Sequence, residues 1–286
     1  MVVQTVDYRS PNAAEEFAHS LHTTGFGVLQ NHPIPWTMIE KAYQEWGAFF
    51  NGTDKFNYTY DPDKQDGYVS TQVAEVAKGE KIKDIKEFYH LYFPWGRYPS
   101  SISSNSRDLF ELQFKLGKEL LSWIERYLPE AVRNKLKEPL LETVSRERTT
   151  YRILHYPPLT GNEPKGAVRA AAHEDINLIT ILPTASASGL EAKDAQGNWH
   201  RVKADPHTLI VNIGDMLQEM TDFYYISTSH RVVNPEGNDA KQARMSMPLF
   251  IHAKAEAYLS KRYPTAESYL HERLVELGLR KQDMMG

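Results

Sequence analysis

The second half of the sequence is a succession of short β-rich runs, and this pattern constrains the fold more than any other feature. Glycine, proline and asparagine separate the runs, as in sheets built from many short strands. The pattern predicts a β-sandwich or jelly roll over residues 149–255, in a protein that is mainly β with flanking helices. The runs are TTYRILHY, NLITILP, GLEA, WHRV, TLIVNI, HRVV and RMSMPLFIH.

Residues 1–148 read as a mostly helical region. Ser10 is a candidate N-cap with Pro11 at the first helical position, and Gly25 ends this helix. The run GFGVLQ then predicts a strand. A second helix follows Pro35, and its apolar stripe is expected to be core. The stripe consists of Ile39, Ala42, Tyr43, Trp46, Phe49 and Phe50.

The serine-rich stretch Ser100–Asp108 predicts a loop and N-cap, because serine and asparagine compete with helical backbone bonding. A third helix carries apolar residues from Leu109 to Tyr127. A last amphipathic helix is predicted over Pro264–Leu279, before a frayed tail. It should pack four side chains on the barrel: Tyr269, Leu270, Leu274 and Leu277. We expect one domain over 1–286, with the C-terminal helix and tail in 256–286.

Composition excludes several kinds of protein. The 286 residues contain no cysteine, which removes disulfides, thiolate nucleophiles and cysteine-ligated metals from consideration. The formal net charge is -4, and the basic residues are spread along the chain, so nucleic acid is not an expected partner. No apolar run approaches the roughly 18 residues of a membrane span. We therefore expect a cytoplasmic protein with no membrane partner.

The segment AAHEDINLIT contains a candidate metal site. His173 and Asp175 are two residues apart, so in a strand both side chains would project from one face, whereas Glu174 would face the other way. His230, at the start of HRVV, is the best-placed second histidine. Two histidines and one carboxylate on one side of iron(II) leave the opposite positions open for substrate and oxygen. A lone His-x-Asp pair is more often two polar residues on a surface strand.

Arg244 and Ser246 form a second pair at the same spacing. An arginine fork matches a carboxylate, and serine adds a hydroxyl donor beside it. Each hydrogen bond to a charged group contributes about 1.5–3 kcal/mol, so loss of Arg244 should weaken binding of a carboxylate co-substrate roughly tenfold to a hundredfold. By itself such a pair is more often an exposed arginine with a neighbouring serine.

Taken in order, these motifs resemble the isopenicillin N synthase and plant-type 2-oxoglutarate dioxygenase family. The resemblance covers nearly the whole chain, and it implies a double-stranded β-helix, which is a cupin-like jelly roll. The matching segments are GFGVLQNHPIP, KDIKEFYHLY, YRILHYPP and the stretch from Gly189 to Val233. Two positions depart from the family pattern: Pro33 stands where glycine is usual, and Leu154 where many members have asparagine.

The resemblance also implies roles for individual residues. It gives the iron(II) ligands as His173, Asp175 and His230, and the residues that contact 2-oxoglutarate as Arg244, Ser246 and Tyr156. Leu154 leaves the contact to the 1-carboxylate open. More residues separate His230 from Arg244 than is usual in the family, which predicts a longer hairpin.

The implied activity is that of an Fe(II)- and 2-oxoglutarate-dependent dioxygenase that uses O2. It would hydroxylate a small molecule such as an amino acid or specialised metabolite, with release of succinate and CO2. Desaturation, ring closure and demethylation remain open. So do an oxidase of the same fold without 2-oxoglutarate, a zinc-dependent hydrolase or isomerase with the same ligands, and a non-catalytic binding protein.

The sequence gives weaker indications of two further sets of residues, one for a substrate pocket and one with a structural role. The candidates for the substrate pocket are Tyr68, Tyr89, Gln218, Met220, Phe250 and His252. Asn212, Gly214 and Asp215 are expected to be structural rather than catalytic, because glycine suits a turn and aspartate accepts backbone hydrogen bonds.

Overall fold

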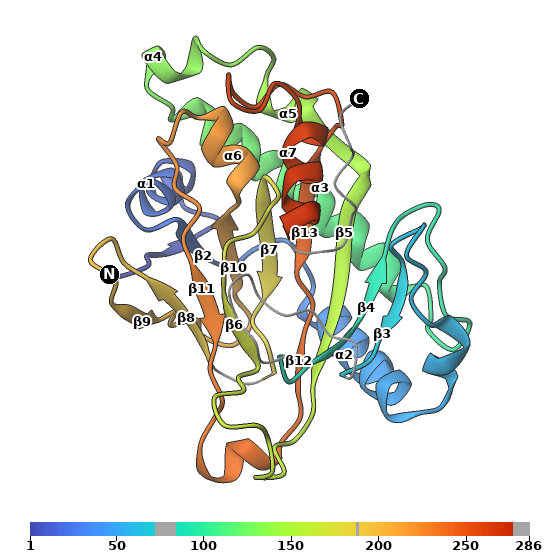
Figure 1. Ribbon diagram of the computed structural model, residues 1–286. Helices are drawn as coiled ribbons and strands as arrows, with labels where there is room; N and C mark the ends of the chain where they lie inside the picture. The colour runs from blue at the N-terminus through green and yellow to red at the C-terminus, as the bar shows by residue number, and fades with distance from the viewer. Residues whose placement is uncertain (72–83, 187–188, 277–286) are drawn as a thin grey trace.

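The computed structural model describes residues 1–71, 84–186 and 189–276. Within these residues the strands form a nine-stranded sheet and a four-stranded sheet that face each other (Figure 1). All strand pairs are antiparallel except β1 with β2. The predicted jelly roll is confirmed.

The larger sheet contains, in spatial order, β1 (Thr5–Asp7), β2 (Phe26–Gln30), β10 (Leu209–Ile213), β7 (Ile179–Pro183), β13 (Leu249–Ala253), β5 (Val144–Tyr156), β4 (Glu87–Leu91) and β3 (Gly67–Val69). A short strand, β12 (Arg244–Ser246), also pairs with β5. The smaller sheet contains β6 (Ala170–His173), β11 (His230–Val232), β8 (Leu190–Lys193) and β9 (Trp199–Arg201).

Three long helices cover the outer face of the larger sheet: α1 (Ala13–Thr24), α2 (Trp36–Asn51) and α3 (Asn105–Arg126). The shorter elements are α4 (Glu130–Arg133), α5 (Leu140–Thr143), α6 (Asp215–Met220) and α7 (Ala266–Glu276), with the 3-10 helices η1 (Asp54–Tyr58) and η2 (Gly237–Lys241). None of the helices in the described part of the chain is long and apolar enough to cross a membrane.

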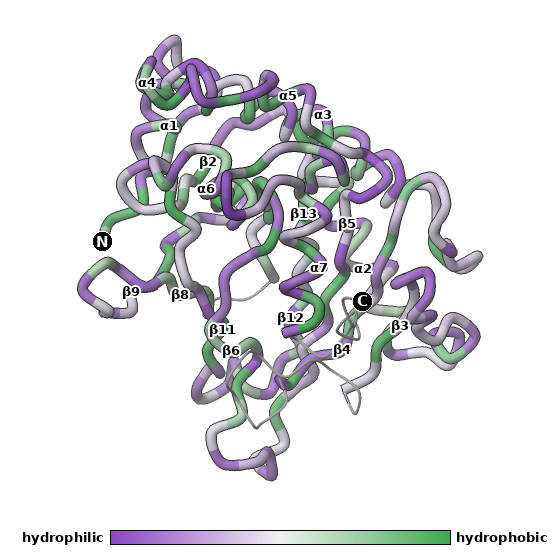
Figure 2. Tube along the Cα trace, turned by 45° about the horizontal axis from the view of Figure 1, so that its top comes forward, coloured by the Kyte–Doolittle hydropathy of each residue, from purple (hydrophilic) through white to green (hydrophobic). Residues whose placement is uncertain are grey.

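Alternation along the strands divides the apolar side chains between two cores. On β2, Leu29 belongs to the larger core beneath the helices, whereas Phe26 and Val28 belong to a smaller core with Leu190 and Val232 of the other sheet. Successive residues of a strand point to opposite faces, so one strand serves both cores. Figure 2 shows hydrophobic stretches along many of the strands and helices, and hydrophilic stretches in many connecting loops.

The predicted stripe on α2 is confirmed as core: Ile39, Ala42, Trp46, Phe49 and Phe50 are buried, and Tyr43 is partly buried. The run RMSMPLFIH is two strands rather than one. Pro248 separates β12 from β13, and because proline has no N–H group it cannot continue a ladder as a donor.

Several predicted boundaries are wrong. Helix α1 has Asn12 rather than Ser10 at its N-cap, because the Ser10 carbonyl instead accepts from Ala13 N in a turn before the helix. The serine-rich loop is shorter than predicted, since Asn105 already begins α3. Strand β5 begins at Val144, before the predicted Thr149.

The first half also supplies strands that helical periodicity did not predict, namely β1, β3 and β4. At the other end, α7 lies within the predicted range and buries Tyr269 and Leu274, with Leu270 partly buried. Leu277 and the predicted tail lie outside the described residues.

Candidate active site

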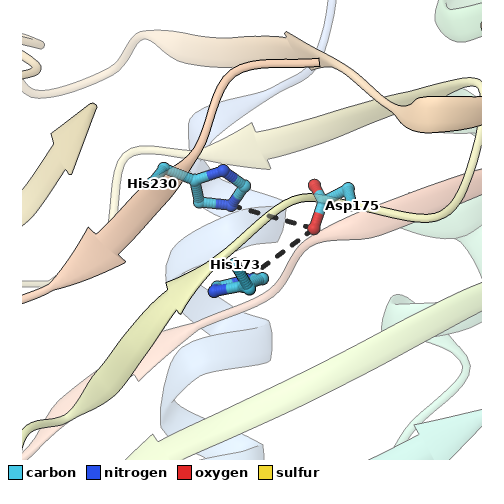
Figure 3. A group of neighbouring side chains, drawn as sticks. All are labelled: His173, Asp175 and His230. Atoms are coloured by element: carbon cyan, nitrogen blue, oxygen red, sulfur yellow. Dashed lines mark ion pairs between the residues drawn. The ribbon is translucent and has the colours of Figure 1, made fainter. Parts of the chain in front are cut away.

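Three side chains, from two neighbouring strands of the smaller sheet and one loop, converge inside the barrel (Figure 3). His173 is the last residue of β6 and lies opposite His230, the first residue of β11. The Nε2 atoms of His173 and His230 lie 3.8 Å and 3.7 Å from Asp175 Oδ1. The three ligand atoms lie within 4.8 Å of one another, so a single metal ion can contact all of them.

The reason predicted for this convergence is only partly right. Strand β6 ends at His173, and Asp175 lies in the loop before β7, so strand alternation alone does not bring the two side chains together. Asp175 is instead held by its own contacts. Its Oδ2 accepts hydrogen bonds from Thr180 Oγ1 at 2.5 Å and Asn212 Nδ2 at 2.8 Å. This directs Oδ1 toward the two imidazoles.

Both imidazoles are oriented by backbone carbonyls. His173 Nδ1 lies 2.8 Å from Ala171 O, and His230 Nδ1 lies 3.1 Å from Thr228 O. A carbonyl oxygen can only accept, so each Nδ1 carries the proton and donates it, which leaves the Nε2 lone pair for a metal. Two imidazole nitrogens and one carboxylate oxygen are a donor set that suits iron(II).

The electrostatics of the site favour the protonation states that a metal requires. Burial and the neighbouring His230 lower the pKa of His173 to about 4, so this imidazole is neutral at physiological pH. Burial by itself would raise the pKa of Asp175, but His230, His173 and the donors on Oδ2 hold it below its ordinary value. A neutral imidazole and a carboxylate are the forms that bind metal.

Residues at the end of β10 and directly after it contact Asp175 and hold it in place. Asn212 donates to its carboxylate, and Asp215 N donates to its carbonyl oxygen at 2.7 Å. Gly214 is required because a Cβ there would lie 2.2 Å from Asn177 Oδ1. The Asp215 side chain accepts a hydrogen bond from Tyr269 Oη and also lines the cavity. That Asn212, Gly214 and Asp215 are structural rather than catalytic stays a prediction.

The residues expected to hold 2-oxoglutarate form a second buried group. In the register of β12 with β5, Arg244 is opposite Tyr156 and Ser246 is opposite Leu154. Arg244, Ser246 and Tyr156 are 2%, 3% and 2% exposed. The Arg244 Cζ atom lies 4.9 Å from the centre of the Tyr156 ring. Leu154 is buried beside this group and offers no polar atom of its side chain.

A second buried arginine in this group was missed from the sequence. Arg169 directly precedes β6, is 0% exposed, and places Cζ 5.9 Å from the centre of the Tyr156 ring. Its Nη2 donates to Gln242 O at 3.0 Å. The only signal in the sequence was an arginine at the start of the strand that carries His173.

A cavity of about 780 Å3 opens onto His173 and Asp175. Its charged lining is mixed: the basic residues are Lys64, Lys86, Arg148, Arg152 and Arg273, and the acidic residues are Asp63, Asp84, Glu147, Glu174, Asp175, Asp215 and Glu276. Of the residues suggested for a substrate pocket, Phe250 and His252 line it. Neither Arg244, Ser246, Tyr156 nor Arg169 belongs to this lining, so the two arginines near Tyr156 are enclosed in the protein.

The other four pocket candidates do not line this cavity. Tyr68 and Tyr89 lie in the core beneath the helices, and Tyr68 donates to Glu87 Oε2 at 2.5 Å. Gln218 Oε1 accepts from Ser227 N, and Met220 is buried in the larger core. Their strands and helix place these side chains outside the cavity lining, which composition cannot reveal.

Two family models match the chain. The 2OG-Fe(II) oxygenase superfamily model matches residues 148–253, and the N-terminal model of non-haem dioxygenases in morphine synthesis matches residues 4–109. Protein DMR6-LIKE OXYGENASE 2 of Arabidopsis thaliana is 29% identical over 266 residues, which are 89% of this chain and 73% of that protein. Proline hydroxylase buaE of Petromyces alliaceus is 28% identical over 270 residues, which are 83% and 82% of the two chains.

Solved structures give the same result. A crystal structure from Shewanella oneidensis, provisionally described as an oxygenase, is 50% identical with a TM-score of 0.88, and the match covers 98% of this chain and 100% of that chain. A Caulobacter crescentus protein, provisionally described as a 2OG-Fe(II) oxygenase, is 30% identical with a TM-score of 0.79, covering 96% and 99%. The resemblance noted in the sequence is confirmed. The chain belongs to the 2OG-Fe(II) oxygenase superfamily and is a 2-oxoglutarate-dependent dioxygenase, with iron(II) as its cofactor and 2-oxoglutarate and O2 as its co-substrates.

Proposed function

We propose that His173, Asp175 and His230 are the iron(II) ligands of this dioxygenase, and that its reaction is the hydroxylation of a small organic molecule. The observation that carries the metal assignment is the convergence of two Nε2 atoms on Asp175 Oδ1, with every other polar atom of the three side chains already hydrogen bonded. Such a donor set holds the ion and leaves the remaining positions for reactants.

We further propose that Arg244, Ser246 and Tyr156 bind the distal carboxylate of 2-oxoglutarate. The proposal is supported by their burial and by the pairing of β12 with β5, which gathers a guanidinium and two hydroxyl groups in one place. An arginine fork binds a carboxylate through two N–H donors and therefore also fixes its direction. With Leu154 beside them, no contact to the 1-carboxylate is assigned to that position.

Iron(II) with 2-oxoglutarate and O2 supplies the oxidising power, and the balanced change is R–H to R–OH with release of succinate and CO2. The protein binds and orients the reactants. His173 and Asp175 line the cavity, so a substrate placed there is close to the proposed ligands. Three relatives are named for hydroxylation, one of proline and two of coumaroyl and feruloyl CoA, which supports hydroxylation over desaturation or ring closure.

A small molecule such as an amino acid or specialised metabolite is the proposed substrate. The cavity volume of about 780 Å3 is in the range of small-molecule sites. Its lining carries both acidic and basic side chains, which suits a small polar molecule. A cytoplasmic location also remains a proposal, supported by the absence of cysteine, and cell fractionation would check it.

The ligand assignment is tested by substituting Asp175→Ala, with Glu174→Ala as the matched control. Glu174 is the adjacent carboxylate and takes no part in the three-residue group. Iron(II) is added without oxygen, followed by 2-oxoglutarate, and the visible absorption of the complex and the bound metal are measured. We expect wild type and Glu174→Ala to bind one iron per chain, and Asp175→Ala to lose iron binding and succinate formation while it stays folded.

Iron binding by Asp175→Ala at wild-type affinity would refute the assignment. Loss of iron binding in both variants would show that the cavity needs acidic groups in general rather than this ligand. Unfolding curves of all three proteins are recorded in parallel, so that loss of metal is separated from loss of fold.

A further inference from the structure

Arg169 has an unusual environment for a charged side chain. It is 0% exposed, and its Nε and Nη1 groups have no hydrogen-bond partner in the described part of the chain. Only Nη2 is satisfied, by Gln242 O. No carboxylate among the described residues forms an ion pair with it. A buried cation without a counter-charge is strongly unfavourable, so two unsatisfied donors indicate a missing anion.

A second buried guanidinium, that of Arg244, makes the environment less favourable still. Arg169 and Arg244 both approach the ring of Tyr156, with Cζ at 5.9 Å and 4.9 Å from its centre. Burial, and secondly the positive charge of Arg244, lower the pKa of Arg169. Two guanidinium groups enclosed together repel each other unless an anion lies between or beside them.

We propose that Arg169 is a second binding residue for the distal carboxylate of 2-oxoglutarate, donating from Nε and Nη1 while Arg244 and Ser246 contact the same group. The inference rests on the proposed function, because it takes the buried group around Tyr156 as the co-substrate site. Arg169 directly precedes β6, whose last residue is His173, so one strand connects this anion site to the proposed metal centre.

The competing explanation is structural, with Arg169 holding the segment before β12 through Gln242 O. The two explanations predict opposite effects on the ligand-free protein. If Arg169 mainly supports the fold, replacing it lowers the unfolding temperature. If Arg169 binds an anion, Arg169→Met removes a charge that is uncompensated without ligand. The ligand-free variant is then as stable as wild type or more stable.

The test measures binding rather than turnover. Four proteins are compared: wild type, Arg169→Met, Arg169→Lys and Arg244→Met. Arg97→Met serves as a control for loss of an arginine that is paired within the chain, since Arg97 Nη2 lies 2.8 Å from Asp66 Oδ1. Each protein is loaded with iron(II) without oxygen, and 2-oxoglutarate binding is measured by calorimetry. Unfolding midpoints of the ligand-free proteins and iron(II) affinities are recorded alongside.

We expect Arg169→Met to bind 2-oxoglutarate roughly tenfold to a hundredfold more weakly, with unchanged iron(II) affinity and no fall in the ligand-free midpoint. Arg169→Lys keeps the charge but loses the fork, and should bind several-fold more weakly than wild type. Arg97→Met should lower the midpoint and leave 2-oxoglutarate affinity unchanged. Wild-type affinity in both Arg169 variants would overturn the inference, and so would a lower midpoint with unchanged affinity in Arg169→Lys.

Failure of the proposed function gives a different pattern. If Arg244→Met binds 2-oxoglutarate as tightly as wild type does, the group around Tyr156 is not the co-substrate site, and the inference falls with it. If Arg244→Met loses affinity and the Arg169 variants do not, the site is right and only the role of Arg169 is wrong.

Discussion

The two faces of β5 show how one strand serves stability and chemistry separately. Tyr151 and Ile153 point outward into the core beneath the helices, and both are 0% exposed. Thr150 and Arg152 point inward and line the cavity. The outward residues contribute buried apolar area, about 1.5–3 kcal/mol for each large side chain. The inward residues bring polar and charged groups into a confined space, which by itself disfavours folding.

The same division applies to the whole larger sheet. On β7, Ile179 and Ile181 are in the outer core, whereas Thr180 contacts the carboxylate of Asp175 on the inner side. A substitution on the outer face should therefore change the free energy of unfolding and leave ligand affinity alone. A substitution on the inner face should change ligand affinity and leave the free energy of unfolding nearly unchanged, unless it adds or removes a charge.

The largest expected effect on stability is from Leu109→Ala on α3. Leu109 is 0% exposed in the outer core, and truncating a buried leucine typically reduces the free energy of unfolding by about 2–5 kcal/mol. Leu112→Ala on the same helix is the matched control, since Leu112 is 36% exposed, and should change stability by only about 0.5 kcal/mol. Denaturant unfolding gives both values. A changed 2-oxoglutarate affinity in folded Leu109→Ala would contradict the claim that residues of the outer core affect stability and not ligand binding.

A smaller effect, visible only at low pH, is expected from His252→Gln on the inner face. Burial, and secondly Arg148, lower the pKa of His252 to about 4 from an ordinary value of 6.5. Between those values the unfolded chain binds a proton that the folded protein does not, so stability falls as the pH falls from 6.5 toward 4.

From pH 7 to pH 5, His252 should account for a loss of about 2 kcal/mol, which His252→Gln should avoid. The measurement is the free energy of unfolding of both proteins at the two pH values. If wild type and His252→Gln lose equal stability between pH 7 and pH 5, His252 takes up a proton in the folded state. The inner face is then more hydrated than its burial indicates.

The smallest expected effect is from Thr180→Val. The substitution keeps the shape of the side chain but removes the hydroxyl that donates to Asp175 Oδ2. Loss of one such supporting hydrogen bond should weaken iron(II) binding roughly tenfold, with a minor change in stability. Thr180→Ser keeps the donor and should retain affinity. If Thr180→Ser loses as much affinity as Thr180→Val, the methyl group rather than the hydroxyl positions the carboxylate.

The parts of the fold that follow from local rules could be predicted from the sequence. The succession of strands after Thr149, the stripe on α2 and the grouping of His173, Asp175 and His230 all have periodic or ordered signals. Boundaries at Asn12 and Asn105 were missed because several adjacent polar residues can begin a helix equally well.

Features that depend on the third dimension could not be predicted. Asp175 leaves the strand yet still reaches the histidines, because Thr180 and Asn212 hold it. Tyr68 and Tyr89 resembled pocket residues, but the face to which they point depends on the pairing of β3 with β4 and on the position of α2. Arg169 had no local pattern, and only its burial beside Arg244 distinguishes it from a surface arginine.

The length of β5 has a consequence for engineering. Its 13 residues pair with β13 and then β12 along one edge and with β4 along the other, so positions along a single segment run from the cavity to the proposed co-substrate site. A library that varies positions 150 and 152 and keeps 151 and 153 constant would sample new substrate preferences on an unchanged scaffold. Directed evolution of this enzyme could therefore begin with two codons.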